Sequence, residues 1–236
     1  MPPVPSRRAS PNRVLARLSA DDFGALEPHL QSVALPLRKQ LETPNKKISH
    51  VYFVESGFAS VVANGVADRS IEVGIVGREG VTGLAVIMGA DRSPHETYMQ
   101  AAGNGQSIAA ATLREAMEQS ASLRRALLQY GHAFNVQTAY TAMANGRSKV
   151  DQRLARWLLM AHDRIDGDDL PLTHEFLALM LAVRRPGVTE ALDVLEKDGF
   201  IRRRRAIISV VDRGGLEERS NGAYGVPEAE FQRLFG

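Results

Sequence analysis

The chain has 236 residues, with 29 Lys and Arg against 27 Asp and Glu, no cysteine and a hydrophobic fraction of 44%. This composition is that of one large or two modest globular domains, and the missing cysteine excludes disulfides, thiolate zinc sites, Cys-ligated iron–sulfur clusters and a cysteine nucleophile. The net charge of +2 does not indicate a nucleic-acid partner unless the basic residues are concentrated locally.

The beginning of the chain is rich in proline and arginine. It lacks the apolar run of about 7–15 residues that a secretory signal needs, and no stretch reaches the roughly 20 apolar residues of a membrane helix. We therefore expect a flexible tail over residues 1–16, a cytoplasmic protein and no membrane partner.

Short strand patterns fill the region that follows. Apolar and β-branched residues recur in four runs, at Val51–Val54, Phe58–Ala63, Ser70–Val76 and Tyr98–Ile108. Short strands at a spacing of about 8–12 residues are typical of a small β sandwich or barrel. We assign this β domain to residues 17–117.

Two turns are predicted between these runs. Glu55-Ser56-Gly57 predicts a hairpin turn between the first and second runs, and Asn64-Gly65 ends the second run. Asn-Gly favours a type I′ turn because both central residues of that turn need a positive φ.

One long helix is predicted over residues 118–146. Its stripe, with spacings of three and four residues, consists of Leu123, Leu127, Tyr130, Phe134, Thr138 and Thr141. Asn145-Gly146 predicts its C-terminal end. A stripe of this length favours a helix shared with a second subunit, and the alternative is a helix packed on its own β domain.

The stretch from Leu170 to Ser209 predicts two short helices joined by a tight turn. Thr173 is an N-cap candidate, and Pro186 suits the first turn of the second helix, where no backbone N–H is needed. The predicted buried face of the second helix comprises Val188, Leu192 and Leu195. This pattern is typical of a helix-turn-helix.

Four consecutive arginines, Arg202 to Arg205, lie between two apolar segments and predict a basic hairpin, or wing. Residues 199–213 hold five Arg against one Asp, whereas residues 147–236 hold 15 basic and 15 acidic side chains. Positive charge is thus focused on one feature, as binding to phosphates requires.

At this point the sequence resembles the Crp/Fnr family of bacterial transcription regulators. Leu170–Glu175, Val183–Leu192 and Leu195–Ile201 resemble the family's DNA-binding helices, and His50–Gly57 resembles its β-roll, the fold of cyclic-nucleotide-binding domains. The resemblance covers about residues 17–215. It implies an α+β protein with an N-terminal, jelly-roll-like β-roll, a long dimerisation helix, and a C-terminal winged helix-turn-helix over residues 147–236.

The family further implies a homodimer on a pseudo-palindromic operator in double-stranded DNA, with RNA polymerase as a possible further partner. The residues expected to bind DNA are Thr173, Arg184, Arg185, Pro186, Gly187, Thr189, Glu190, Arg202, Arg203, Arg204 and Arg205. Along the recognition helix, well-known members carry a Glu, then a Ser or Gly, then an Arg. The matching positions in this chain are Pro186, Thr189 and Glu190, in that order. We favour Arg185 for a guanine contact, because Glu190 cannot make one, and Arg184 for a phosphate contact.

The resemblance also places an effector pocket at Gly80, Val81, Thr82, Gly83, Arg92 and Ser93. In the family, a Glu at the Val81 position holds a ribose, and an Arg-Ser pair grips the cyclic phosphate. Valine cannot accept a hydrogen bond, so we expect no high-affinity cyclic-nucleotide binding, no cofactor and no metal. Haem would need a ligand such as His95 or His132, and an apolar small molecule in the β-roll remains an open alternative.

Two other classes of function are the alternatives to a DNA-binding regulator. One is a cyclic-nucleotide-responsive signalling module whose C-terminal domain docks a protein, which would bind with little salt dependence. The other is an enzyme, but the histidines and carboxylates are scattered without a nucleophile motif, so we expect no catalytic activity.

Overall fold

The computed structural model describes residues 10–65 and 70–236. Its contacts divide the chain into two compact units. The first unit holds the described residues up to Val61 together with residues 76–135 and 231–236, and the second holds the described residues of 62–75 together with residues 136–230. The chain therefore passes between the units several times.

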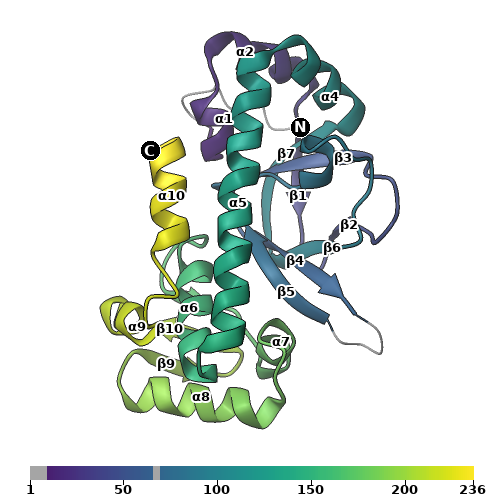
Figure 1. Ribbon diagram of the computed structural model, residues 1–236. Coiled ribbons are helices and arrows are strands. Elements are labelled where there is room, and N and C mark those ends of the chain that lie inside the picture. The colour runs from purple at the N-terminus through teal and green to yellow at the C-terminus, as the bar shows by residue number, and fades with distance from the viewer. Residues whose placement is uncertain (1–9, 66–69) are drawn as a thin grey trace. The chain divides into compact units, whose positions relative to one another are not determined.

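The strands of the N-terminal half form two sheets (Figure 1). One is antiparallel in the order β1-β7-β3, with β1 (Gln31–Leu35), β7 (Gly103–Ala109) and β3 (His50–Val54). The other has the order β2-β6-β4-β5, with β2 (Gln40–Glu42), β6 (Glu96–Ala101), β4 (Phe58–Asn64) and β5 (Ser70–Val76). These two sheets confirm the predicted β-roll.

The predicted turn at Glu55–Gly57 is present, but it does not close a hairpin. β3 pairs with β7, whereas β4 lies beside β6 and β5, so the turn carries the chain from one sheet to the other. Gly57 has φ +68°, and a Cβ there would lie 2.5 Å from the carbonyl oxygen of Ala101, so glycine is required. The predicted pairing is wrong because a turn does not determine which strands become neighbours.

β4 and β5 are neighbours, in agreement with the prediction that the chain turns between them. Their connection includes residues 66–69, which lie outside the described residues. The type I′ turn at Asn64-Gly65 therefore stays a prediction.

The chain is already folded at residues 10–16. These residues lead into α1 (Arg13–Arg17), in which Leu15 is buried. The predicted tail over residues 1–16 is wrong for this part, because two apolar residues in a helix of five give too short a pattern to recognise. Residues 1–9 lie outside the described residues.

Asn12 holds α1 in place. Its Oδ1 accepts a hydrogen bond from the backbone N–H of Leu15, which caps the helix. Its Nδ2 donates to the carbonyl oxygens of Val54 and Gly80, each at 2.7 Å. One buried side chain thus joins three segments that are distant in sequence.

Helices cover the rest of the first unit. They are α2 (Ala20–Leu26), the 3-10 helix η2 (Glu27–His29), α3 (Leu84–Ile87), α4 (Ala110–Gln119) and the first half of α5 (Ala121–Arg147). Their apolar side chains share one buried core with β3 and β7. The single helix predicted over residues 118–146 is in fact the end of α4, a break at Ser120, and α5, which continues past Asn145-Gly146.

The second unit is mainly helical. It contains α6 (Val150–His162), β8 (Asp169–Leu170), α7 (His174–Met180), α8 (Arg185–Lys197), β9 (Ile201–Arg204), β10 (Ile207–Val210), α9 (Arg213–Arg219) and the first part of α10 (Val226–Phe235). α6 packs against both α8 and α9. No described helix is long and apolar enough to cross a membrane.

Part of β5 belongs to this second unit. The indole Nε1 of Trp157 donates a 2.6 Å hydrogen bond to the buried carboxylate of Glu72. The amide side chain of Gln137 accepts from the backbone N–H of Ile75 and donates to its carbonyl oxygen. These polar contacts fasten the β5 segment to α6 and α5.

Candidate nucleic-acid interface

The helix-turn-helix is built from α7 and α8. The side chain of Thr173 accepts from the N–H of Phe176, so Thr173 is the N-cap of α7, as predicted. Pro186 lies in the first turn of α8, and Gly199, with φ +80°, follows its end. The sequence signals for starting and stopping these helices are therefore confirmed.

The turn between the two helices contains a strained residue. Ala182 has φ +48°, a left-handed conformation that an alanine adopts only at a cost. The backbone N–H of Val183 bonds the carbonyl oxygen of Ala178, which closes α7 just before Arg184 begins the approach to α8.

Apolar packing fixes the orientation of α8. Its inner face is fully buried and comprises Val188, Leu192 and Leu195, as predicted. Trp157 of α6 meets Phe176 of α7 edge to face, with ring centroids 5.5 Å apart. The opposite face of α8 is left exposed, including Arg185 and Glu190.

The wing is a three-stranded sheet in the order β8-β10-β9. Arg204 pairs with Ile207, so Arg205 and Ala206 form its tip. The four arginines were predicted to occupy a turn, but only Arg205 does so, because the ladder continues through Arg204.

The four wing arginines differ in their partners. Arg203 points toward α8 and bonds Asp193 and Glu196, and its side-chain and backbone hydrogen bonds to Glu196 hold the pKa of that carboxylate below its usual value. Arg204 pairs with Asp169 of β8 at 2.8 Å. Arg202 and Arg205 are exposed, and neither side chain has a partner among residues 10–65 and 70–236.

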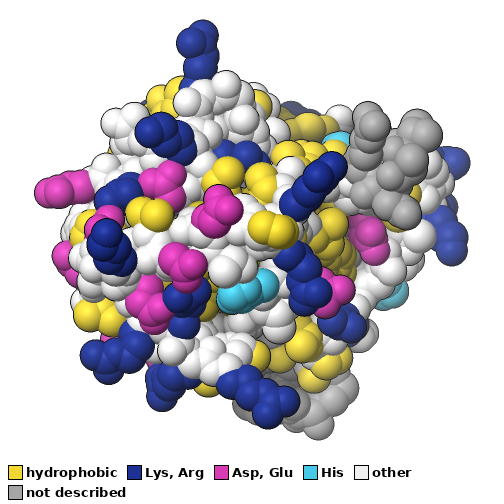
Figure 2. All heavy atoms as spheres, turned by 90° about the horizontal axis from the view of Figure 1, so that it is seen from below, with side chains coloured by type: hydrophobic (Ala, Val, Ile, Leu, Met, Phe, Trp, Pro, Cys, Tyr) yellow, Lys and Arg dark blue, Asp and Glu magenta, His cyan; other side chains and the backbone are white. Residues whose placement is uncertain are grey.

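The arginines at the start of α8 are also exposed. Arg185 lies 3.8 Å from Glu175, a loose contact between two largely exposed side chains, and Arg184 has no side-chain partner in the described part of the chain. Such an ion pair contributes about 0–1 kcal/mol. On the face seen in Figure 2, Lys and Arg side chains are interspersed with Asp and Glu.

A hollow of about 320 Å³ lies between the helix-turn-helix and the wing. It is lined by Leu172, Thr173, His174, Arg185, Thr189, Arg203, Arg204, Ala206, Ile207 and Ile208. No acidic side chain lines it. The fold thus brings five of the predicted DNA-binding residues, Thr173, Arg185, Thr189, Arg203 and Arg204, around one concave surface.

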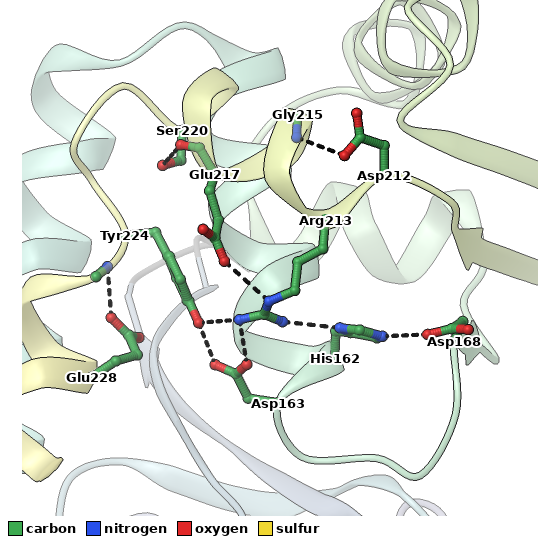
Figure 3. A network of polar contacts seen from close by, with 11 residues as sticks. His162, Asp163, Asp168, Asp212, Arg213, Gly215, Glu217, Ser220, Tyr224 and Glu228 are labelled. Atoms are coloured by element: carbon green, nitrogen blue, oxygen red, sulfur yellow. Dashed lines mark hydrogen bonds and ion pairs between the residues drawn. The ribbon is translucent and has the colours of Figure 1, made fainter.

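The C-terminal end of the wing is anchored by Arg213 (Figure 3). Its guanidinium contacts Asp163 and His162 at the end of α6, Glu217 one turn along α9, and the hydroxyl of Tyr224. Burial and the neighbouring Asp163 raise the pKa of Tyr224. Arg213 therefore has a structural role: it links α9 to the end of α6. It is nevertheless one of the five arginines that make residues 199–213 positively charged.

The carboxylates that neutralise the wing were not foreseen as part of the interface. Asp169 comes from β8, and Asp193 and Glu196 come from α8, so only the folded sheet and helix bring them to Arg203 and Arg204. His174 was also overlooked, although its place beside the N-cap Thr173 could have indicated it.

The predicted effector residues differ in exposure: Gly80, Val81, Thr82 and Gly83 are buried, whereas Arg92 is exposed. Val81 is fully buried in the apolar core, and a Cβ on Gly80 would lie 2.2 Å from the hydroxyl oxygen of Tyr130. The N–H of Gly83 donates to the buried carboxylate of Glu42 at 2.8 Å. Arg92 is exposed and pairs with its neighbour Asp91.

Two further residues of that predicted set make local contacts. Thr82 is buried, and its Oγ1 accepts from the backbone N–H of Tyr52. The hydroxyl of Ser93 accepts from the backbone N–H of His95. Both side chains thus stabilise loops of the β-roll. No cluster of three or more potential metal ligands occurs in the described residues.

Part of the predicted dimer stripe is buried within the chain itself. Leu123, Leu127 and Tyr130 are buried in the core of their own unit, and Phe134 packs against that core. Thr138 and Thr141 are partly buried, and Thr141 bonds the carbonyl oxygen of Gln137. For the first three residues the alternative interpretation, packing on the chain's own β domain, is the one observed.

α5 has a second stripe, which is exposed. It follows spacings of four and three residues and comprises Ala121, Arg125, Leu128, His132, Asn135, Ala139, Ala142 and Gly146. A shallow hollow of about 450 Å³ lies along its first half, around Leu128. A repeat of 3.5 residues is the spacing at which two helices pack side by side.

Residues 152–219 match the Crp-like helix-turn-helix domain. Solved structures with a similar fold include FixK2 from Bradyrhizobium japonicum, with a TM-score of 0.69 and 16% identity over 80% of this chain and 96% of that one. Another is the c-di-GMP-responsive global regulator CLP of Xanthomonas campestris. Its TM-score is 0.63, with 19% sequence identity over 81% of this chain and 99% of that one.

A CRP-family transcriptional regulator of Thermus thermophilus has a TM-score of 0.65 and 19% sequence identity over 82% of this chain and 98% of that one. No curated protein matches the sequence. At these low identities the solved structures show a similar fold only. The match in sequence is limited to the helix-turn-helix domain at residues 152–219. The chain carries a Crp-like helix-turn-helix domain within the fold of the Crp/Fnr transcription regulators.

Proposed function

We propose that the protein is a sequence-specific, DNA-binding transcription regulator that acts as a homodimer on a pseudo-palindromic operator. The observation that carries this proposal is the concave surface between α8 and the wing, where arginines project and no acidic side chain lines the hollow. A recognition helix and a wing of this kind bind the major groove and the adjacent backbone.

Base recognition falls to the exposed start of α8. Arg185 has the reach for a bidentate contact with guanine, and its loose pair with Glu175 breaks at little cost. Thr189 lies one turn further along the same face. Glu190 is exposed and can accept from a cytosine amine.

Backbone contacts fall to Arg184 and to the wing. Arg202 and Arg205 carry no carboxylate partner in the described structure, so their full charge is available to phosphates. Arg203 is held by Asp193 and Glu196, and we assign it the role of bracing the wing against α8.

The dimer would form along the exposed stripe of α5. Its small residues, such as Ala139 and Ala142, would permit close approach of a second helix, and Leu128 supplies an apolar contact that is 46% exposed in the single chain.

A cyclic nucleotide is not part of the proposal. Val81 fills core space, and the carboxylate of Glu42 already occupies the N–H of Gly83.

The wing provides the test of this function. We expect Arg202→Ala and Arg205→Ala each to weaken binding to all duplexes, because each removes a phosphate contact. The slope of log K against log salt should fall by about 0.9 per arginine lost, or about 1.8 for a dimer. Fluorescence anisotropy on a duplex recovered by selection from random DNA would measure it.

Arg203→Ala is the matched control, since it removes the same charge from a position that is already neutralised. It should lower the stability of the wing and change the salt slope less. Equal slopes for all variants and the wild type would show that the wing does not touch DNA. A wild-type protein that recovers no duplex from selection would instead favour a protein-docking module.

A further inference from the structure

His174 is the only histidine that lines the hollow between the helix-turn-helix and the wing. It opens α7, and its ring contacts Thr189 on α8, with 3.3 Å between Nδ1 and Oγ1. The imidazole therefore lies where the start of one helix meets the exposed face of the other.

The Thr189 hydroxyl lies within hydrogen-bond distance of both the carbonyl oxygen of Arg185 and the ring of His174. The Thr189 hydroxyl donates its single hydrogen to the carbonyl oxygen of Arg185 at 3.2 Å. In this arrangement the hydroxyl accepts from His174, and Nδ1 is the nitrogen that carries the proton. A second proton would have to bind Nε2, for which the described residues provide no partner.

The charged side chains that line the hollow with His174 are all arginines. α8 contributes Arg185, and β9 contributes Arg203 and Arg204. Their carboxylate partners, Asp193, Glu196 and Asp169, do not line the hollow, and on α7 itself Glu175 is 82% exposed and lies near Arg185. The hollow around the ring is therefore lined by guanidinium groups and by no carboxylate, which suits an anionic ligand.

We propose that His174 is a proton-linked phosphate ligand: a backbone phosphate of DNA enters the hollow, and Nε2 takes up a proton and donates a hydrogen bond to it. The inference rests on the proposed DNA-binding function and adds a pH dependence to it. A phosphate oxygen against Nε2 places a negative charge beside the ring, and this charge favours the imidazolium form in the complex.

The sign of the effect follows from linkage. If the complex binds one more proton per subunit than the free protein, affinity rises as pH falls through the range in which imidazole titrates. Uptake of one proton per subunit can raise the binding constant by at most tenfold per pH unit. Between pH 8 and pH 6 we expect the binding constant to rise by about three- to tenfold per subunit. Because the ligand is a phosphate, the effect should be the same on any duplex sequence.

The test uses the full chain and two labelled duplexes, one recovered by selection and one with the same bases scrambled. Binding is measured by anisotropy at pH 6 and pH 8 at fixed salt, and proton uptake by calorimetry in buffers of different ionisation enthalpy. His174→Gln should abolish proton uptake and flatten the pH profile, since the amide can still donate to Thr189. His29→Gln, which changes an exposed histidine of the first unit, is the matched control and should behave as wild type.

A second variant distinguishes loss of the charge from a structural change caused by His174→Gln. His174→Lys carries a permanent charge, so it should bind at pH 8 about as tightly as the wild type binds at pH 6. The proposal is overturned if His174→Gln keeps the wild-type pH profile, or if the profile changes on the selected duplex alone. Absence of wild-type binding to either duplex at both pH values would refute the proposed function itself.

Discussion

At the scale of single residues, Glu42 is the most unusual group of the first unit. Its carboxylate is buried, accepts the N–H of Gly83, and is also hydrogen-bonded by Thr97. Burial raises the pKa of Glu42 above its usual value, although both hydrogen bonds oppose the shift. An acid whose pKa is raised on folding destabilises the folded state once it ionises.

Glu42→Gln should therefore raise the free energy of unfolding at neutral pH, since the amide oxygen can still accept from Gly83. The wild type gains stability as pH falls through its raised pKa toward the unfolded value near 4.5, so the difference should shrink on acidification. Urea unfolding at several pH values measures this.

The exposed Glu118→Gln of α4 is the control and should leave the pH dependence unchanged. A Glu42→Gln protein that is less stable than the wild type at every pH would mean that the hydrogen bonds outweigh the burial of the charge.

At the scale of elements, those with local signals could be predicted and those with distant partners could not. Thr173, Pro186 and Gly199 determine where α7 and α8 start or stop through bonds within a few residues, and these boundaries were predictable. Asn12 and Gly57 act through Val54, Gly80 or Ala101, which lie far along the chain, so the tail and the hairpin were wrongly assigned.

α5 shows the same limit in one helix. Its two stripes have almost the same spacing, and the sequence favoured the more apolar one as the dimer face. That stripe is the better core, and the chain's own β domain covers Leu123 and Leu127. Periodicity identifies the helix, but the choice between core and interface depends on what packs against it.

The exposed stripe gives a prediction for the dimer. Leu128→Glu introduces a charge at the centre of its first half, and we expect the dimer dissociation constant to rise at least tenfold, or about 1.4 kcal/mol. Sedimentation equilibrium measures this. Leu37→Glu, at a residue that is 57% exposed elsewhere in the same unit, is the matched control. Unchanged association of Leu128→Glu would place the interface elsewhere.

At the scale of the whole molecule, the two units are interwoven in sequence. Residues 147–236 were predicted to form one DNA-binding domain, but residues 231–236 belong to the first unit and the described part of 62–75 to the second. Trp157 needs Glu72 as its hydrogen-bond acceptor, so an isolated fragment 147–236 would lack a buried partner.

The C-terminal residues are part of the first unit's core. Phe235 is buried in it and stacks on Phe231, with ring centroids 4.8 Å apart. The carbonyl oxygen of Gly236 accepts from the guanidinium of Arg17, the last residue of α1. The end of the chain thus stabilises elements near its beginning.

Phe235→Ala should therefore lower the stability of the first unit by about 3 kcal/mol, the usual cost of truncating a buried phenylalanine. Hydrogen exchange followed by mass spectrometry should show faster exchange in peptides from α1 and α4, with little change in α7 and α8, because the cavity opens in the core that α1 and α4 share. Val226→Ala, at an exposed position of the same helix, should change neither set. If α7 and α8 lost protection as strongly as α1 and α4, the two units would unfold as one, and the division of the chain into two cooperative parts would be wrong.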